Sequence, residues 1–142
     1  MSRFQILVLN GPNLNLLGTR EPEVYGAATL DDLVSDLRKR FPDIEIADVQ
    51  SNDEGALIDA IQDFGSRFNG IVFNPGGYAH TSVAIRDAVS SISAPVIEVH
   101  ISNIHAREEF RNISIVGGAC KAVISGLGVS GYAVAIAHLK SL

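Results

Sequence analysis

Glu98 and His100 stand two residues apart in the apolar run V-I-E-V-H. Residues two apart on a strand point to the same face, so Glu98 could accept a hydrogen bond from one ring nitrogen of His100. Such a carboxylate fixes the imidazole tautomer and supports the protonated ring, as an acid–base histidine requires. The alternative is a purely structural ion pair, because an acidic residue in an apolar strand is costly unless it is paired.

Arg20 and Tyr25 form a second pair of chemical interest, in the segment N-G-P-N-L-N-L-L-G-T-R-E-P-E-V-Y-G from Asn10 to Gly26. A guanidinium within about 4–6 Å of a phenol lowers the phenol's pKa by roughly 1–3 pH units, from a usual value of about 10. The segment has no helical or alternating period and is long for a connection, so we expect a binding loop or lid. The alternative is a surface Arg and an anchoring Tyr.

Hydrophobic periodicity predicts the elements that must position these residues. Short apolar runs predict strands over 4–9, 44–49, 70–73, 96–100 and 122–124. Amphipathic helices are expected after a cap at Thr29, at Ser51 or Asn52, and at Thr81 or Ser82, with a last helix over 130–139. This alternation of strand and helix predicts an α/β fold with a flavodoxin-like, open, doubly wound five-stranded parallel sheet.

Polar residues follow several of these strands. Asn13 follows the first strand, Asn74 and His80 follow the third, and Ser102 follows the fourth. Each alone is most simply a loop residue that satisfies backbone groups. The carboxyl ends of parallel strands lie on one edge, where ligands of such sheets bind, so together these residues predict a site there.

The run N-P-G-G at 74–77 is expected to lead into a helix N-terminus, whose amides could bind carboxylate or hydroxyl groups. On residue type alone, Asp87 is a solvated helix residue and Arg111 is a surface charge. The G-L-G-V-S-G run at 126–131 fits a dinucleotide fingerprint. It lacks the further strand and acidic residue that such a fold needs before Leu142, so we expect a tight turn there and no cofactor.

Length, charge and cysteine content limit the classes of protein to which the chain can belong. A chain of 142 residues predicts one domain, spanning 1–142. The net charge of −5 argues against nucleic acid or an anionic membrane as the main partner, although a local basic pocket could hold a small anion. Cys120 is the only cysteine, the first apolar run is too short for a signal peptide, and no membrane-length apolar run occurs. We therefore expect a cytoplasmic protein, and the histidine spacing predicts no zinc site.

The motifs together resemble the type II 3-dehydroquinate dehydratase family nearly end to end. The matching blocks are the Asn10–Gly26 segment, Q-S-N with E-G, N-P-G-G-Y-A-H-T-S with A-I-R-D, E-V-H-I-S-N-I-H-A-R-E-E-F-R, and G-L-G-V-S-G-Y. The resemblance implies that Tyr25, as tyrosinate, removes a proton from C2 of 3-dehydroquinate, with Arg20 lowering its pKa from a mobile lid. An enolate forms, which Asn13 helps to stabilise through a water. His100, braced by Glu98, then protonates the departing hydroxyl.

The resemblance also implies the substrate-binding residues and the assembly. The residues that would bind substrate hydroxyl and carboxylate groups are Asn74, His80, Ile101 and Ser102 through their backbone, and Arg111. Asp87 would reach in from a neighbouring subunit of a homododecamer made of four trimers. The chain departs from the family pattern at Ala79, where a hydroxyl residue is common, and over 115–121. A non-catalytic flavodoxin-like module that binds flavin or nucleotide phosphate is the alternative function.

Overall fold

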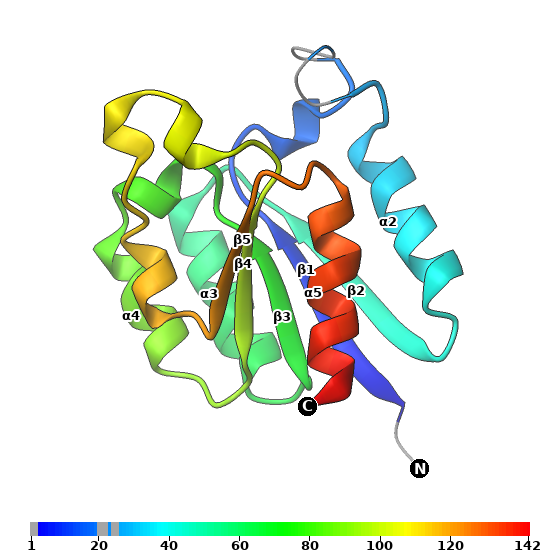
Figure 1. The fold of residues 1–142 in the computed structure, drawn as a ribbon. Coiled ribbons are helices and arrows are strands. Elements are labelled where there is room, and N and C mark those ends of the chain that lie inside the picture. Colours follow the sequence, from blue (N-terminus) through cyan, green and yellow to red (C-terminus); the bar gives the residue numbers. More distant parts are fainter. Residues whose placement is uncertain (1–2, 20–22, 24–25) are drawn as a thin grey trace.

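The computed structural model describes residues 3–19, 23 and 26–142. Its strands are β1 (Phe4–Asn10), β2 (Ile44–Gln50), β3 (Gly70–Asn74), β4 (Val96–His100) and β5 (Ala122–Ser125). They form one sheet in the order β2-β1-β3-β4-β5, with every neighbouring pair parallel (Figure 1). This is the strand order of flavodoxin-like doubly wound sheets, so the predicted fold class is confirmed.

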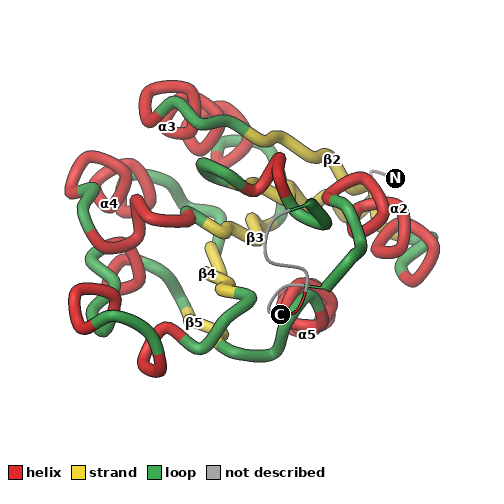
Figure 2. Tube along the Cα trace, turned by 90° about the horizontal axis from the view of Figure 1, so that it is seen from above, coloured by secondary structure: helices red, strands yellow, loops and turns green. Residues whose placement is uncertain are grey.

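Helices cover both faces of the sheet. Figure 2 shows α2 (Leu30–Arg40) and α5 (Ser130–Ser141) on one face, and α3 (Glu54–Gly65) and α4 (Val83–Ser90) on the other. Alternate residues of β1 serve the two faces: Ile6 and Val8 pack with the α2 and α5 side, and Leu7 and Leu9 with the α3 and α4 side. A strand buried on both faces must be apolar throughout, which explains its unbroken apolar sequence. Within the described residues, no helix is long and apolar enough to cross a membrane.

Two of the predicted helix caps are confirmed. Thr29 Oγ1 accepts a hydrogen bond from Asp32 N, and Asp32 Oδ2 accepts one from Thr29 N, both at 3.1 Å. This reciprocal capping box satisfies two amides that have no partner within the helix. Ser82, one of the two candidates for α4, accepts from Ile85 N at 2.9 Å.

The predicted cap of α3 at Ser51 or Asn52 is wrong. Asp53 caps this helix, because its Oδ1 accepts from Gly55 N at 2.9 Å. The two preceding side chains are engaged elsewhere: Ser51 Oγ accepts from Asp53 N at 3.0 Å, and Asn52 Oδ1 accepts from Asn13 N at 3.0 Å.

The segment after β3 also differs from expectation. A short 3-10 helix, η2 (Gly76–His80), follows Pro75, and the α-helix begins only at Val83. Gly76 has a φ of 60°, a left-handed conformation that an α-helix cannot contain. A 3-10 helix of five residues aligns few peptide dipoles, so the predicted seat at an α-helix N-terminus is not formed there.

The glycine-rich run after β5 forms the predicted tight turn into α5. Gly126 and Gly128 have φ angles of 93° and 61°, which residues with a β-carbon rarely adopt. A β-carbon at Gly126 would also lie 3.1 Å from the Asn103 side chain. The turn therefore brings the loop after β4 against the start of α5.

Candidate active site

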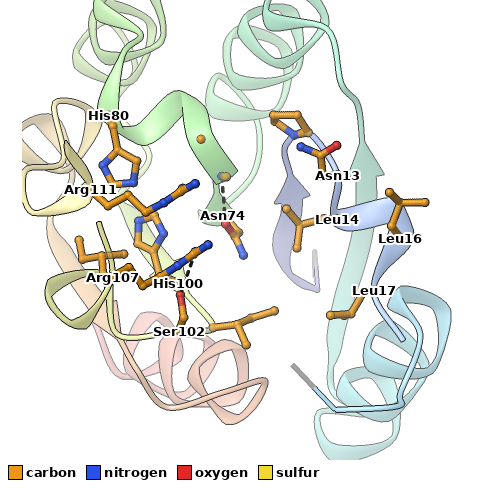
Figure 3. Close-up of a pocket in the computed structure, with 15 residues that line it drawn as sticks. Asn13, Leu14, Leu16, Leu17, Asn74, His80, His100, Ser102, Arg107 and Arg111 are labelled. Atoms are coloured by element: carbon orange, nitrogen blue, oxygen red, sulfur yellow. Dashed lines mark hydrogen bonds between the residues drawn. The ribbon is translucent and has the colours of Figure 1, made fainter. Parts of the chain in front are cut away.

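A cavity of about 150 Å³ opens at the carboxyl ends of β1, β3 and β4 (Figure 3). Seven of the predicted site residues line it: Asn13, Asn74, His80, His100, Ile101, Ser102 and Arg111. Pro12, Leu14, Leu16, Leu17, Gly76, Gly77, Ile104 and Arg107 complete the lining. The expected convergence of sequence-distant polar groups on this edge is therefore observed.

The first wall of the cavity is the segment after β1. Gly11 N donates to Asn74 O at 2.7 Å, which joins the ends of β1 and β3. Asn13 follows in the left-handed conformation, with a φ of 72°, and begins the 3-10 helix η1 (Leu14–Leu16). Leu17 is buried in the core cluster on the α2 side, which provides the apolar support that this segment needs.

His100 lies in the opposite wall, and its partner Glu98 is buried and does not line the cavity. His100 Nε2 donates to Glu98 Oε2 at 2.7 Å, as the two-residue spacing predicts. Glu98 is 0% exposed and His100 is 6% exposed, so water screens the pair little. Because Nε2 is engaged by the carboxylate, Nδ1 is the ring nitrogen that remains for proton transfer.

His80 lies beside His100, with ring centroids 6.1 Å apart and an interplanar angle of 27°. His80 Nδ1 lies 2.8 Å from the backbone oxygen of Ile113. A carbonyl oxygen only accepts, so Nδ1 carries the proton, and Nε2 is an acceptor in the neutral ring. Figure 3 shows both rings along the same wall of the cavity.

Arg107 and Arg111 make the cavity locally basic in a chain of net charge −5. Glu108 Oε1 accepts from Arg111 Nε at 3.1 Å, which holds the guanidinium. Hydrogen bonds from the backbone amide of Glu108 and, secondarily, from Arg111 lower the pKa of the Glu108 carboxyl. This carboxyl is therefore ionised at neutral pH. Arg107 Nη1 donates to Ser102 Oγ at 3.2 Å. Two guanidinium groups at one cavity fit a carboxylate-bearing ligand.

Arg107 was missed in the sequence analysis. It lies four residues before Arg111 in the quoted E-V-H-I-S-N-I-H-A-R-E-E-F-R block. Its closeness in sequence to Arg111, which was already a candidate, could have indicated that it belongs to the site. The backbone of Ile101 and Ser102 is also held in place, since their carbonyl oxygens accept from Gly128 N at 3.0 Å and Ser125 Oγ at 3.1 Å.

Several predicted residues are not part of this cavity. Asp87 is an exposed residue of α4 and does not line it. Ala79 is 0% exposed and lies behind the lining, so a change in substrate affinity from this departure would have to act indirectly. Arg20 and Tyr25 lie outside the described residues, and their roles remain predictions.

Candidate nucleophiles are poorly placed. Burial, and secondarily the negative charge of Glu98, raises the pKa of Cys120 to about 12, so its thiol is not ionised at neutral pH. The three lysines, Lys39, Lys121 and Lys140, are exposed and do not line the cavity. Among the described residues, no group of three or more His, Cys, Asp or Glu side chains could hold a metal ion.

Comparison with known proteins places the chain in a family. The sequence profile described as dehydroquinase class II matches residues 4–140, so the chain belongs to the class II dehydroquinase family. A 3-dehydroquinate dehydratase from Exiguobacterium sp. is 55% identical over 134 residues, which cover 94% of this chain and 92% of that protein. A catabolic 3-dehydroquinase from Pyricularia oryzae is 54% identical over 140 residues, covering 92% and 86% respectively. The crystal structure of a type II dehydroquinase from Butyrivibrio crossotus has a TM-score of 0.95 at 48% identity and covers 99% of both chains.

Proposed function

We propose that this protein dehydrates 3-dehydroquinate to 3-dehydroshikimate in the shikimate pathway, by an enolate-mediated anti elimination. The observation that carries the proposal is His100, which lines a cavity with Arg107 and Arg111 and is bonded at 2.7 Å to the buried Glu98. It supplies a positioned acid next to cations suited to a substrate carboxylate. The membership of the class II dehydroquinase family supports the same reaction.

In the proposed mechanism, Tyr25 as tyrosinate takes the proton from C2, and the electron pair moves to the ketone oxygen to give an enolate. Arg20 favours the tyrosinate through its positive charge. Asn13 stabilises the enolate through a water. These three assignments rest on the family resemblance, with Asn13 lining the cavity.

His100 then acts as the general acid. Its imidazolium donates the Nδ1 proton to the departing hydroxyl while the enolate collapses, so water leaves and the ring ends neutral. Glu98 lowers the energy of the imidazolium through the bond at Nε2. The substrate hydroxyl and carboxylate groups are bound by Asn74, His80, the backbone of Ile101 and Ser102, and Arg111.

For assembly, we propose a homododecamer of four trimers in the cytoplasm, each protomer a single domain over 1–142, with Asp87 entering a neighbour's site. Asp87 lies on α4, whose first residue, Val83, is an exposed apolar side chain at 58%. Phe110 and Ile113 are exposed at 69% and 73%. Exposed apolar side chains such as these three are expected where a protomer contacts other protomers of the same chain.

The test of function is direct. Purified protein mixed with 3-dehydroquinate should produce the ultraviolet absorption band of the conjugated enone, without added cofactor. His100→Ala should lower kcat by about 10²–10⁴-fold, the range for loss of a positioned acid. His138→Ala, an exposed histidine on α5, is the matched control and should keep full activity. Absence of the band, with tight flavin or nucleotide binding instead, would establish the non-catalytic alternative.

A further inference from the structure

The oxygen of Glu98 that binds His100 has a second partner. Ser114 Oγ lies 2.7 Å from Glu98 Oε2, the same oxygen that accepts from His100 Nε2 at 2.7 Å. Ser114 lies between the 3-10 helices η4 (Glu109–Arg111) and η5 (Val116–Ala119), and it does not line the cavity. It therefore contacts the proposed acid only through Glu98.

The direction of the Ser114 bond follows from its other partner. Gly117 N donates to Ser114 Oγ at 2.9 Å, so that contact uses a lone pair of the hydroxyl and leaves its proton free. The backbone oxygen of Ala79, at 3.5 Å, is a much poorer acceptor than Glu98 Oε2. The Ser114 hydroxyl thus donates to the carboxylate.

In the described part of the chain, the hydrogen bonds that stabilise the Glu98 carboxylate all reach Oε2, from His100 and Ser114. Glu98 Oε1 is buried and has no hydrogen-bond partner among the described residues. The stabilisation of this carboxylate therefore comes through Oε2, from His100 and Ser114. An oxygen that accepts two hydrogen bonds carries no proton itself, so the proton of the Glu98–His100 contact lies on His100 Nε2 and not on Glu98 Oε2.

We propose that Ser114 is a positioning residue: its hydroxyl donates to Glu98 Oε2, so that the proton between Glu98 and His100 stays on His100. The inference rests on the proposed role of His100 as the acid. Without the serine hydroxyl, Glu98 competes more strongly for the proton. Part of the population then holds a neutral carboxylic acid against a neutral imidazole, which cannot protonate the leaving group.

The backbone around Ser114 connects the same segment to the second histidine. Ile113 O accepts from His80 Nδ1 at 2.8 Å, and Ile115 N donates to Ala79 O at 2.7 Å. Arg86 Nη1 of α4 donates to Ile115 O at 2.8 Å. The segment 113–115 thus contacts His80 directly and His100 through Glu98, and its last residue begins the part of the chain that departs from the family pattern.

Other ionisable groups surround the Glu98–His100 pair and belong in the test. His80 stacks at 6.1 Å from His100, and Arg107 and Arg111 line the same cavity. Cys120, after η5, is close enough for the charge of Glu98 to contribute to its raised pKa, and it stays neutral. Because other ionisable groups surround the pair, the limb of the pH–rate profile that reports the Glu98–His100 pair must be identified by experiment. It is the limb that moves in the Glu98→Gln variant.

The experiment compares Ser114→Ala with wild type under steady-state conditions. Loss of a hydrogen bond to a charged group predicts a fall in kcat of about 10-fold to 100-fold. KM should stay within about twofold, because Ser114 does not line the cavity. The limb displaced by Glu98→Gln should move to higher pH, because a carboxylate with one donor fewer holds the shared proton more tightly. Ser114→Thr should retain most of the activity, and Ser114→Cys, a similar shape with a weaker donor, should be intermediate.

A double-mutant cycle separates this role from simple support of the fold. In a Glu98→Gln background, Ser114→Ala should have little further effect on kcat, because both changes act on one interaction. Ser66→Ala is the control: Ser66 Oγ also bonds one backbone oxygen, that of Asp63, at 2.8 Å, at the end of α3. It should leave kcat unchanged in both backgrounds.

Two results would overturn the inference. One is a Ser114→Ala variant with wild-type kcat, and the other is a loss that multiplies fully with Glu98→Gln. A failure of the proposed function looks different: the wild-type protein would then form no enone. A failure of the His100 assignment alone would leave dehydration intact in His100→Ala and Glu98→Gln. If Ser114→Ala does not fold, the Ser114→Thr and Ser114→Cys comparison decides the question alone.

Discussion

The Tyr132 hydroxyl donates to Asn10 Oδ1 at 2.6 Å, across 122 residues of sequence. The same hydroxyl accepts from Asn74 Nδ2 at 3.0 Å, and Asn74 Oδ1 accepts from Gly76 N at 3.1 Å. Tyr132 is fully buried, and burial raises its pKa far above the usual value, so the hydroxyl keeps its proton. This network orients Asn74 at the cavity from the α5 side of the sheet.

Tyr132→Phe should loosen Asn74 and destabilise the fold. The change leaves a buried acceptor on Asn10 and a buried donor on Asn74 without a hydrogen-bond partner. Each such group lowers the free energy of unfolding by about 1–3 kcal/mol. At fixed protein concentration we expect a Tm several degrees lower and a raised KM with a smaller change in kcat. Tyr78→Phe loses a single hydrogen bond, to Asn52 O at 3.0 Å, and should lower Tm less. Equal Tm losses in the two variants would contradict the network's importance.

Tyr25→Phe should remove nearly all turnover while substrate-analogue binding remains. Only the ionisable oxygen is lost, so kcat should fall by about 10²–10⁴-fold. Calorimetric titration with a non-reacting analogue measures binding, and Tyr78→Phe again serves as the control. A kcat near that of wild type would rule out Tyr25 as the base.

Arg20→Ala should lower kcat and shift the pH profile. A nearby cation favours tyrosinate, so its removal raises the pKa of the base, and the limb on which the rate rises with pH moves to higher pH. Arg20→Lys retains the positive charge and should shift that limb less. If the profile of Arg20→Ala shows no alkaline shift, the electrostatic role of Arg20 is wrong.

The proposed assembly can be tested by mixing inactive variants. Asp87→Asn and His100→Ala protomers should each be inactive as pure oligomers. When they are unfolded together and reassembled in equal amounts, about a quarter of the sites combine an intact His100 with an intact Asp87 from a neighbour. Light scattering on the same samples reports the oligomer. An active monomer, or no recovered activity in verified mixed oligomers, would exclude Asp87 acting across an interface.

The reaction should proceed without a covalent intermediate on lysine. A Schiff-base mechanism needs a desolvated amine in the cavity, whereas Lys39 and Lys121 are exposed away from it and Lys140 binds Asp43 at the surface. Borohydride added with substrate should neither inactivate the protein nor increase its mass. A stable lysine adduct in the mass spectrum would overturn the enolate mechanism.

The sequence alone predicted the parallel sheet, most element boundaries and the shared face of Glu98 and His100. These features follow from periods of 2 and 3.6 residues, which are properties of the backbone. The cap of α3 and the α-helix N-terminus expected directly after β3 were exceptions. Ser51, Asn52 and Asp53 are three adjacent capping residues, and the choice among them depends on Asn52 being drawn to Asn13, 39 residues away in sequence.

The amino-acid sequence by itself determined that polar residues end the strands and that a carboxylate can brace His100. Only the tertiary structure decided that Nε2 is the braced nitrogen, that Ser114 shares Glu98 Oε2, and that Tyr132 holds Asn74. The physical reason is the range of the interactions. Backbone geometry repeats locally, whereas hydrogen-bond partners far apart in the chain meet only after the apolar faces of the helices have packed on the sheet.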